Sequence, residues 1–189
     1  MLWSAHLHVS PAMPAVALPP SVEYQHAFLA MLADFDAHDA HNTEFYAPAK
    51  SDFRAYVQSL LDEERGLNLL EGRVPCTHRW LVTTRKAVVG VTRLRHNIST
   101  PFLSESAGHI GYNIAPSHRG RGYGHAALRA ALAEATAIGL QRVLLLTGAN
   151  NAPSRSVIER QGGVLESIAF SAFWDEQLCR YWVNVPRRG

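Results

Sequence analysis

The sequence is poor in cysteine and has no long apolar run. Its two cysteines, Cys76 and Cys179, lie far apart and form no CxxC pair, so neither a disulfide framework nor a zinc site is indicated. We therefore expect a reducing, cytoplasmic location. The first residues lack the basic and apolar regions of a secretory signal, and no later stretch is apolar enough to span a bilayer.

Lysine is also scarce, and charge of either sign is not in excess. The net charge is +2 and no dense basic run occurs, which argues against nucleic acid or an anionic membrane as the main partner. Only Lys50 and Lys86 are lysines, so the basic residues are nearly all arginines, whose planar guanidinium group suits bidentate contacts with phosphate.

Length and composition predict one domain over residues 1–189, because 189 residues with 47% hydrophobic content can bury a full core. Four early prolines predict a loosely ordered tail over residues 1–14. Periodicity and breaker residues then predict an α/β fold. The expected helices are about 22–38, 52–65 (capped by Ser51), 122–138 and 153–161, and the expected strands 15–18, 80–84, 87–95, 108–114, 142–147, 164–172 and 178–185.

The most informative segment lies between the strand at 108–114 and the helix that starts near Gly122. It reads Arg119-Gly-Arg-Gly-Tyr-Gly124, with three glycines at alternate positions. Glycines let a ligand approach the main chain, and a helix start adds unpaired N–H groups and a positive dipole. The segment therefore predicts a pyrophosphate-binding loop.

Other phosphate motifs fit this segment less well. The spacing from Gly122 to Ala127 satisfies the GxGxxG/A pattern of a dinucleotide fold, but no acidic residue ends the strand at 142–147. A Walker A loop needs a lysine, and neither lysine is near. A plain strand-to-helix turn remains an alternative on spacing alone.

The sequence of this region resembles those of the GNAT superfamily of acetyl-CoA-dependent N-acetyltransferases. Within the superfamily, it resembles a group of bacterial predicted acetyltransferases of undefined substrate. Arg119-x-x-Gly122-x-Gly124 is similar to the family's R/Q-x-x-G-x-G/A signature, and residues 108–116 and 151–163 resemble the segments on either side. The resemblance implies a mixed, mostly antiparallel central sheet flanked by helices and splayed between its fourth and fifth strands.

The resemblance also implies the acetyl-CoA contacts. Main-chain groups of the fourth strand would pair with the pantetheine arm, loop amides would hold the pyrophosphate, and the start of the following helix would reach the pantetheine. The cofactor-binding residues expected in this way are Tyr112, Asn113, Ile114, Arg119, Gly120, Arg121, Gly122, Tyr123, Gly124, His125, Asn151 and Ser154. For Asn151, the sequence equally predicts a helix N-cap ahead of Pro153, and the two roles are compatible.

Catalysis requires a neutral amine, so a base or a water relay is useful. His109 is the first candidate base, because its strand position resembles one where relatives often carry Glu or His; a structural histidine is the alternative. Many relatives place a tyrosine seven residues after the motif asparagine as the acid, but here that residue is Ile158. Tyr112 or Tyr181 would have to substitute for it.

We therefore expect direct transfer of an acetyl group from acetyl-CoA to a primary amine of unknown identity, with no metal. A non-catalytic acyl-CoA-binding or sensing module is the main alternative, and a dinucleotide-dependent oxidoreductase comes third. Acidic residues between the first two helices, Asp36 and Asp39 among them, suggest a cationic acceptor. The segment 93–96 could be a strand edge or part of the acceptor mouth. An exposed C-terminal strand could pair across a homodimer.

Overall fold

The computed structural model describes residues 14–186, which contain two antiparallel sheets. The tail expected over residues 1–14 thus lies almost entirely outside the described residues. The first sheet has the order β1 (Ala15–Leu18), β2 (Cys76–Thr83), β3 (Val88–Arg95), β4 (Ile110–Ile114), and the second has the order β5 (Arg142–Gly148), β7 (Glu176–Asn184), β6 (Val164–Ser171). All neighbouring strands in these two sheets pair antiparallel.

Five α-helices and several short turns of helix connect the strands. The α-helices are α1 (Gln25–His38), α2 (Ala47–Ser51), α3 (Phe53–Arg65), α4 (Tyr123–Ala137) and α5 (Ala152–Arg160). The short elements are η1 (Val22–Tyr24), η2 (Ala40–Asn42), η3 (Glu44–Tyr46), η4 (Leu103–Ala107) and η5 (Pro116–His118). In the part of the chain that the structure describes, no helix has the length and hydropathy needed to cross a membrane.

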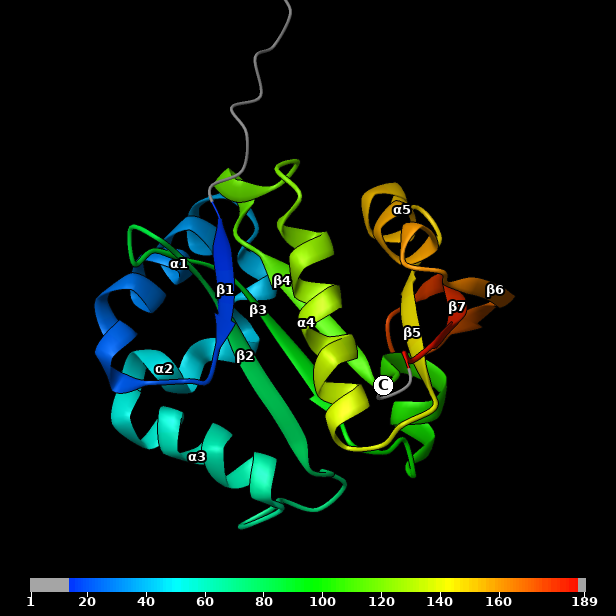
Figure 1. Cartoon of the computed structure of the whole chain (residues 1–189), viewed down its shortest axis with the longest axis horizontal. Coiled ribbons are helices and arrows are strands. Elements are labelled where there is room, and N and C mark those ends of the chain that lie inside the picture. The colour runs from blue at the N-terminus through cyan, green and yellow to red at the C-terminus, as the bar shows by residue number, and fades with distance from the viewer. Residues whose placement is uncertain (1–13, 187–189) are drawn as a thin grey trace, which may run out of the picture.

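The first sheet is covered on both faces (Figure 1). Helices α1, α2 and α3 lie against one face, where Phe28, Phe53 and Trp80 form an aromatic core with ring centroids 4.4–5.9 Å apart. Helix α4 covers the other face, and its fully buried Ala127 and Ala135 let it lie close to the strands. The fold thus presents β4 between two helical layers.

The sheets separate between β4 and β5, as the family resemblance implies (Figure 1). Their only ladder contact among residues 14–186 is a bridge between Gly108 and Leu145, next to a hydrogen bond from the His109 N–H to the Leu144 carbonyl at 2.7 Å. A β-carbon at Gly108 would lie 2.5 Å from that carbonyl oxygen, so only glycine allows this approach. Beyond the bridge, the edge of β4 that faces β5 has no strand partner.

Three sequence-based expectations need correction. Strand β2 begins at Cys76 rather than near residue 80, because its polar first half pairs with β3 and its side chains bind acidic residues of α3. The cap of α3 is Asp52, whose carboxylate accepts from the Ala55 N–H at 2.9 Å, while Ser51 ends the separate helix α2. The C-terminal strand β7 is the centre of its sheet, and β6 is the edge.

Candidate active site

Two cavities meet at the split between the sheets. A small cavity of about 170 Å³ lies between β4, β5 and α5, and a large cleft of about 1190 Å³ opens on the side of α2 and α3. Five residues line both of them: Arg93, Ile110, Gly111, Leu146 and Thr147. Two substrates can therefore approach from opposite sides and meet between β4 and β5.

The small cavity contains three of the predicted site residues. The Tyr112 hydroxyl lies 3.0 Å from the Ser154 hydroxyl, and burial raises the pKa of Tyr112, so it stays protonated at neutral pH. Asn151 is the N-cap of α5: its side-chain oxygen accepts from the Ser154 N–H at 3.1 Å. This leaves the amide N–H groups of Asn151 available to a ligand. Ile158, 1% exposed, forms the apolar wall.

The glycine loop is shaped to receive an anion. Gly120 and Gly122 have φ angles of +73° and +86°, and a β-carbon on either would meet no protein atom within 4 Å. Helix α4 has Gly122 as its N-cap, which supplies no side-chain cap, and none of the main-chain N–H groups of residues 120–125 donates a hydrogen bond within the described chain. The loop therefore offers unpaired N–H groups beside open space.

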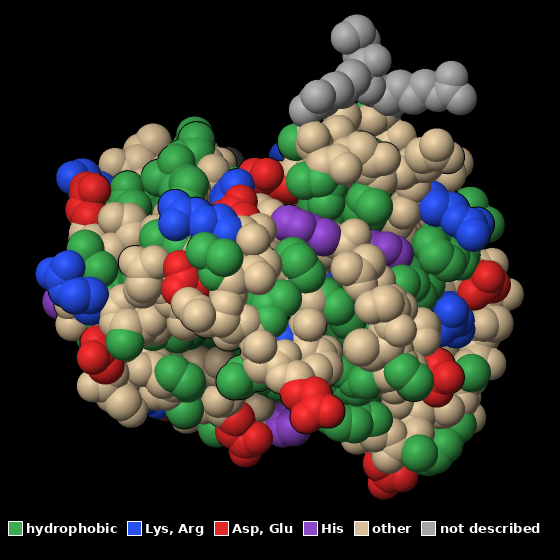
Figure 2. Space-filling model, turned by 90° about the horizontal axis from the view of Figure 1, so that it is seen from below, with side chains coloured by type: hydrophobic (Ala, Val, Ile, Leu, Met, Phe, Trp, Pro, Cys, Tyr) green, Lys and Arg blue, Asp and Glu red, His purple; other side chains and the backbone are tan. Residues whose placement is uncertain are grey.

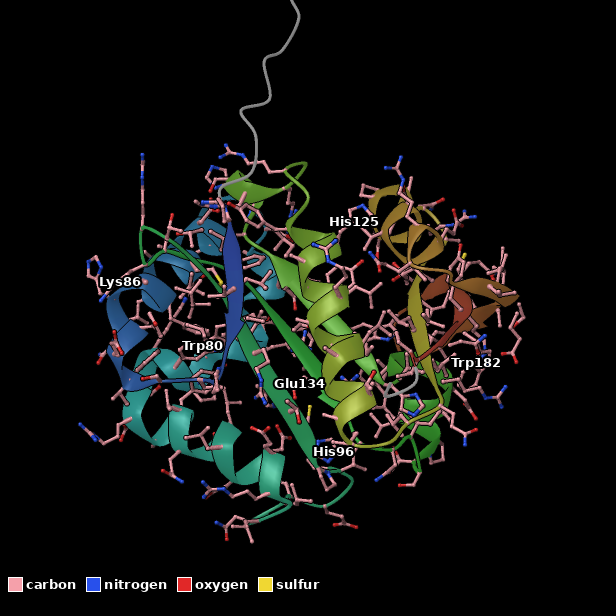
Figure 3. The ribbon with its side chains drawn as sticks, viewed as in Figure 1. Trp80, Lys86, His96, His125, Glu134 and Trp182 are labelled. Atoms are coloured by element: carbon pink, nitrogen blue, oxygen red, sulfur yellow. The ribbon has the colours of Figure 1, made fainter. Side chains whose placement is uncertain are left out.

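This loop adjoins the small cavity. A β-carbon on Gly124 would lie 3.2 Å from a Val157 methyl carbon of α5 and 3.7 Å from the Tyr112 ring. His125 lies at the start of α4 on the side facing α5 (Figure 3). Tyr123 is buried in the core at 4% exposure, so only its main chain can contact a ligand. The loop and the cavity thus form one continuous surface.

The two loop arginines differ in their contacts. Arg119 donates from Nε to the Ile114 carbonyl at 3.0 Å and is hydrogen-bonded to the Asp39 carboxylate, so it braces the end of β4 against η2. Arg121 is exposed and forms no hydrogen bond or ion pair within the described chain. Arg121 is therefore the loop cation that is free to contact a phosphate.

His109 does not reach either cavity. Its side chain is 7% exposed, and its Nδ1 accepts a hydrogen bond from the Leu144 N–H at 3.0 Å. Burial and the nearby Arg95 lower the pKa of His109 to about 4. These contacts tie the start of β4 to β5. Its role as a catalytic base stays a prediction, and its geometry favours a structural one.

Tyr181, the other candidate acid, also lies outside both cavities. It is fully buried, donates to Glu159 Oε1 at 2.6 Å and accepts from Arg155 Nε at 3.0 Å. Of the two tyrosines, only Tyr112 faces the place where the cavities meet.

Asp34 and Asp36, near the end of α1, and Asp39, directly after it, do not line the large cleft, whereas His41, Asn42 and Glu44 of the following segment do. Asp36 binds Lys50 at 2.6 Å, Asp39 is paired with Arg119, and Asp34 accepts from the Ser117 main chain and hydroxyl at 2.9 and 2.8 Å. These three carboxylates contact partners outside the cleft, so the structure gives them no direct part in acceptor binding. The expectation that this acidic segment favours a cationic acceptor stays a prediction.

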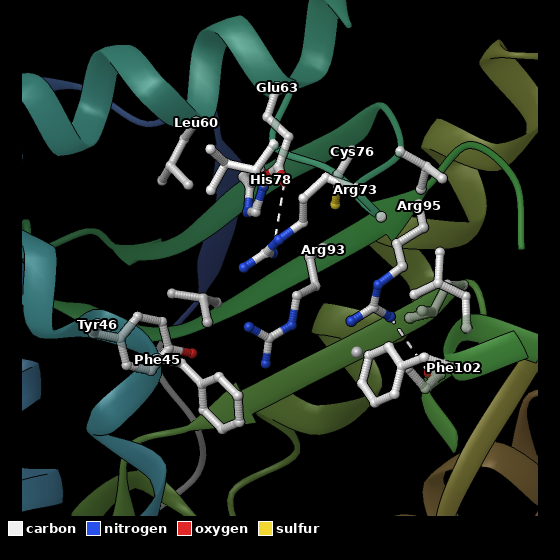
Figure 4. A pocket seen from close by; sticks show the side chains of 18 of the residues that line it. Phe45, Tyr46, Leu60, Glu63, Arg73, Cys76, His78, Arg93, Arg95 and Phe102 are labelled. Carbon is white, nitrogen blue, oxygen red and sulfur yellow. Dashed lines mark hydrogen bonds and ion pairs between the residues drawn. The ribbon is translucent and has the colours of Figure 1, made fainter. Parts of the chain in front are cut away.

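Two side chains in the wall of the large cleft, Tyr46 and Arg93, were not among the site residues predicted from the sequence (Figure 4). Both donate to the side-chain oxygen of Asn113, at 2.9 and 2.5 Å, and the Asn113 amide donates to Asn42. Asn113 itself lines neither cavity. Arg95 lies on the same face of β3. The segment 93–96, whose placement the sequence left open, is thus part of the cleft, and the polar–apolar alternation of β3 was the available signal.

One group of side chains in this wall could hold a metal ion. Glu63, Cys76 and His78 place ligand atoms within 4.8 Å of one another. The His78 ring nitrogen and the Glu63 carboxylate already lie 2.5 Å apart as an ion pair, and Arg73 lies 3.7 Å from Glu63. Because Glu63 and His78 satisfy each other, we assign no ion to this group.

Glu176 brings a carboxylate to the end of β5. It lines the large cleft, and a β-carbon on Gly148 would overlap its carboxylate, so the side chain lies directly over the residue that follows Thr147. Thr147 lines both cavities, and Glu176 forms no ion pair within the described chain. No motif pointed to this residue, which is the first residue of β7 and pairs with Ser171 of β6.

The model of the acetyltransferase (GNAT) domain matches residues 19–164. The chain belongs to this family. It is an acetyl-CoA-dependent acetyltransferase, and the fold predicted from the sequence is that of the GNAT domain. No curated protein sequence matches the chain.

Solved structures share this fold at low sequence identity. The ribosomal L7/L12 alpha-N-protein acetyltransferase RimL in complex with coenzyme A is 17% identical, with a TM-score of 0.68 over 94% of this chain and 97% of that one. The microcin C7 self-immunity acetyltransferase MccE, in complex with acetyl-CoA and AMP, is 14% identical, with a TM-score of 0.65 over 90% and 92%. A putative GNAT-family acetyltransferase from Bordetella pertussis is 19% identical, with a TM-score of 0.62 over 89% and 95%.

Proposed function

We propose that this chain transfers an acetyl group from acetyl-CoA to a primary amine by direct attack of the amine on the thioester. The observation that carries the proposal is the meeting of the two cavities at residues that line both, Arg93 and Thr147 among them. One cavity adjoins the glycine loop, and the other opens to solvent. Direct transfer needs this arrangement, because both reactants must reach one point from different sides.

The residues around the small cavity fit coenzyme A. The amides of residues 120–125 and Arg121 would hold the pyrophosphate at the helix start, and the free edge of β4 from Tyr112 to Ile114 would pair with the pantetheine amides. Asn151 and Ser154 would contact the same arm from α5. The open space beside Gly120 and Gly122 supports this placement. RimL and MccE, which share the fold, are complexes with coenzyme A and acetyl-CoA, which supports coenzyme A as the ligand.

We assign the proton donor for the leaving thiolate to the hydroxyl pair of Tyr112 and Ser154. The two oxygens lie 3.0 Å apart in the small cavity, where family members with the usual motif place a tyrosine from α5 and this chain has Ile158. Hydrogen bonding between the two lets Tyr112 pass a proton to the thiolate directly or through Ser154.

For the base, we propose Glu176 in preference to His109. Glu176 lies in the cleft through which the amine enters, whereas His109 uses Nδ1 to accept a main-chain hydrogen bond and lines neither cavity. A carboxylate at this place can take a proton from the ammonium form of the acceptor, directly or through water.

Release of free thiol from acetyl-CoA, measured with a panel of amines, tests the proposal. Turnover that depends on an amine and yields its N-acetyl product is expected. Tight binding of acetyl-CoA without turnover of any amine would favour the acyl-CoA-binding module instead. Thermal stabilisation by coenzyme A and none by NAD(P) would separate both from a dinucleotide enzyme.

Two further properties remain proposals. Strand β6 is the edge of its sheet and exposes Val164, Ile168 and Phe170 by 67%, 52% and 58%, so a homodimer would form here rather than through β7. Light scattering of the wild-type protein and of Ile168→Lys tests this.

Both cysteines are free and buried, in agreement with the reducing cytoplasm that the sequence predicts.

A further inference from the structure

Two arginines in the large cleft lack a carboxylate partner although they are partly buried. Five arginines in residues 14–186 are not fully exposed: Arg79, Arg93, Arg95, Arg155 and Arg180. Three of them lie 2.6–3.8 Å from a glutamate, and the exceptions are the two on β3. Removing a charge from water is costly unless an opposite charge compensates it. Arg93 and Arg95 therefore mark a place for an anion.

Arg93 lies where the two cavities meet. Its Nε is buried and is the only buried side-chain nitrogen or oxygen in the described chain that has no hydrogen-bond partner. A β-carbon on Gly111 would lie 3.0 Å from this Nε, so the glycine lets the guanidinium group lie flat over β4. The group contacts Asn113 at one end and lies 5.9 Å from the Phe45 ring. Nη1 also has no hydrogen-bond partner and is not among the buried unpartnered atoms, so its N–H groups remain for a ligand at the reaction point.

Arg95 extends the same positive surface. It follows Arg93 by two residues, so both side chains leave the same face of β3, about 7 Å apart along the strand. Within residues 14–186, its guanidinium group donates only to the carbonyls of Gly108, at 2.9 Å, and Ala107, at 3.4 Å. Burial and Arg93 lower the pKa of Arg95 to about 10, which leaves it charged at neutral pH. Figure 4 shows both guanidinium groups directed into the cleft.

The acidic residues of the cleft do not pair with these two arginines. Glu63 is held by His78 at 2.5 Å and by Arg73 at 3.7 Å. No carboxylate of the described chain lies within 4.0 Å of either arginine, although four other acidic residues also line the cleft: Glu44, Asp62, Glu71 and Glu176. On the face seen in Figure 2, basic and acidic side chains lie interspersed. Arg93 and Arg95 thus lack a direct ion-pair partner within a cleft that also contains carboxylates.

We propose that the acceptor amine carries an anionic group, a carboxylate or a phosphate, which Arg93 and Arg95 bind while the amine faces the thioester. This inference rests on the proposed function and names the substrate class of the same site. Because Arg93 lies at the meeting point of the cavities, the anionic group is close to the amine in the acceptor. Polyamines and other wholly cationic acceptors are repelled by the same two charges.

Matched acceptor pairs that differ in charge test this inference. The pairs are ethanolamine phosphate against ethanolamine, and each amino acid against its amide; the first reports phosphate and the second carboxylate. In wild type, kcat/KM should favour the anionic member of at least one pair by about ten- to a hundredfold, as expected for hydrogen bonds to a charged group. The ratio should fall close to one in Arg93→Gln, fall partly in Arg95→Gln, and recover partly in Arg93→Lys.

The control is Arg85→Gln, which removes the same charge from the exposed turn between β2 and β3 and should keep the wild-type ratio. Comparing ratios between variants cancels the different basicities of the paired amines. A wild-type enzyme that turns over both members of every pair equally would overturn the inference and leave the acetyltransferase function standing. An equal fall in kcat/KM for both members of each acceptor pair in Arg93→Gln would also overturn the inference. That result would mean that the guanidinium group acts on the acetyl group, which both reactions share, and not on the anionic group of the acceptor.

A binding measurement separates the two proposals when no amine in the panel reacts. Inorganic phosphate and acetate are added to protein saturated with coenzyme A, so that the glycine loop is occupied, and thermal unfolding is followed. One of the two anions should raise the Tm of wild type and Arg85→Gln but not of Arg93→Gln/Arg95→Gln. That result without turnover would retain the anion site and reject the proposed function. Equal Tm shifts in all three proteins would reject the anion site.

Discussion

Gly122 and Gly139 offer a matched test of the glycine loop, because they share one local conformation and differ only in position. Their φ angles are +86° and +82°, and a β-carbon on either would meet no protein atom within 4 Å. Gly122 starts α4 beside the small cavity, whereas Gly139 follows the other end of the same helix. Substitution by alanine therefore causes the same backbone strain in both places.

The expected losses follow from that geometry. A left-handed conformation costs a residue with a β-carbon about 1–2 kcal/mol, so both variants should lose about that much free energy of unfolding. In Gly122→Ala, the new methyl group also fills the space proposed for the pyrophosphate. Loss of one N–H contact with a charged phosphate costs about 1.5–3 kcal/mol, or a factor of about ten to a hundred in affinity.

The assay combines urea denaturation with calorimetric titration of coenzyme A. Both variants should show a similar fall in unfolding free energy, and only Gly122→Ala should bind coenzyme A more weakly than wild type. Equal affinities in the two variants would refute the placement of the pyrophosphate at this loop. A loss of affinity in Gly139→Ala would show that helix stability, rather than the loop, controls binding.

Three more predictions concern the chemistry of the site. Tyr112→Phe and Ser154→Ala should each lower kcat by about tenfold or more with little change in KM for acetyl-CoA, whereas Tyr181→Phe should affect unfolding more than kcat. Glu176→Gln should lower kcat about a hundredfold at neutral pH and recover activity as the pH rises, because more acceptor amine is then neutral; an unchanged kcat would exclude Glu176 as the base. The pKa of His109 is about 4 in the folded state against an ordinary value of 6.5. Its neutral form therefore contributes to the free energy of unfolding in full above pH 6.5, and this contribution is lost as the pH falls towards 4. The total loss is about 3 kcal/mol. Urea denaturation of His109→Gln should lose that slope, while its pH profile of kcat should match that of wild type unless His109 is the base.

The order of elements and the glycine loop were readable from the sequence, because both depend on local chemistry. A run of β-branched residues after a short turn predicted the strand β3, and glycines ahead of an alanine-rich helix predicted the loop at Gly122. The family signature in the same residues then implied the split between β4 and β5, which the structure contains. Asn151 was predicted as an N-cap on the same local grounds.

The contacts that decide the chemistry required the tertiary structure. Asp39 is hydrogen-bonded to Arg119, 80 residues away in the sequence, and Asp34 to Ser117, 83 residues away. These contacts hold the two carboxylates away from the cleft in which the sequence analysis expected them. Likewise, only packing shows that His109 is buried against β5 while Arg93 has no carboxylate beside it. A residue type sets which interactions a side chain can make, but long-range packing sets which partners are present and how much water remains.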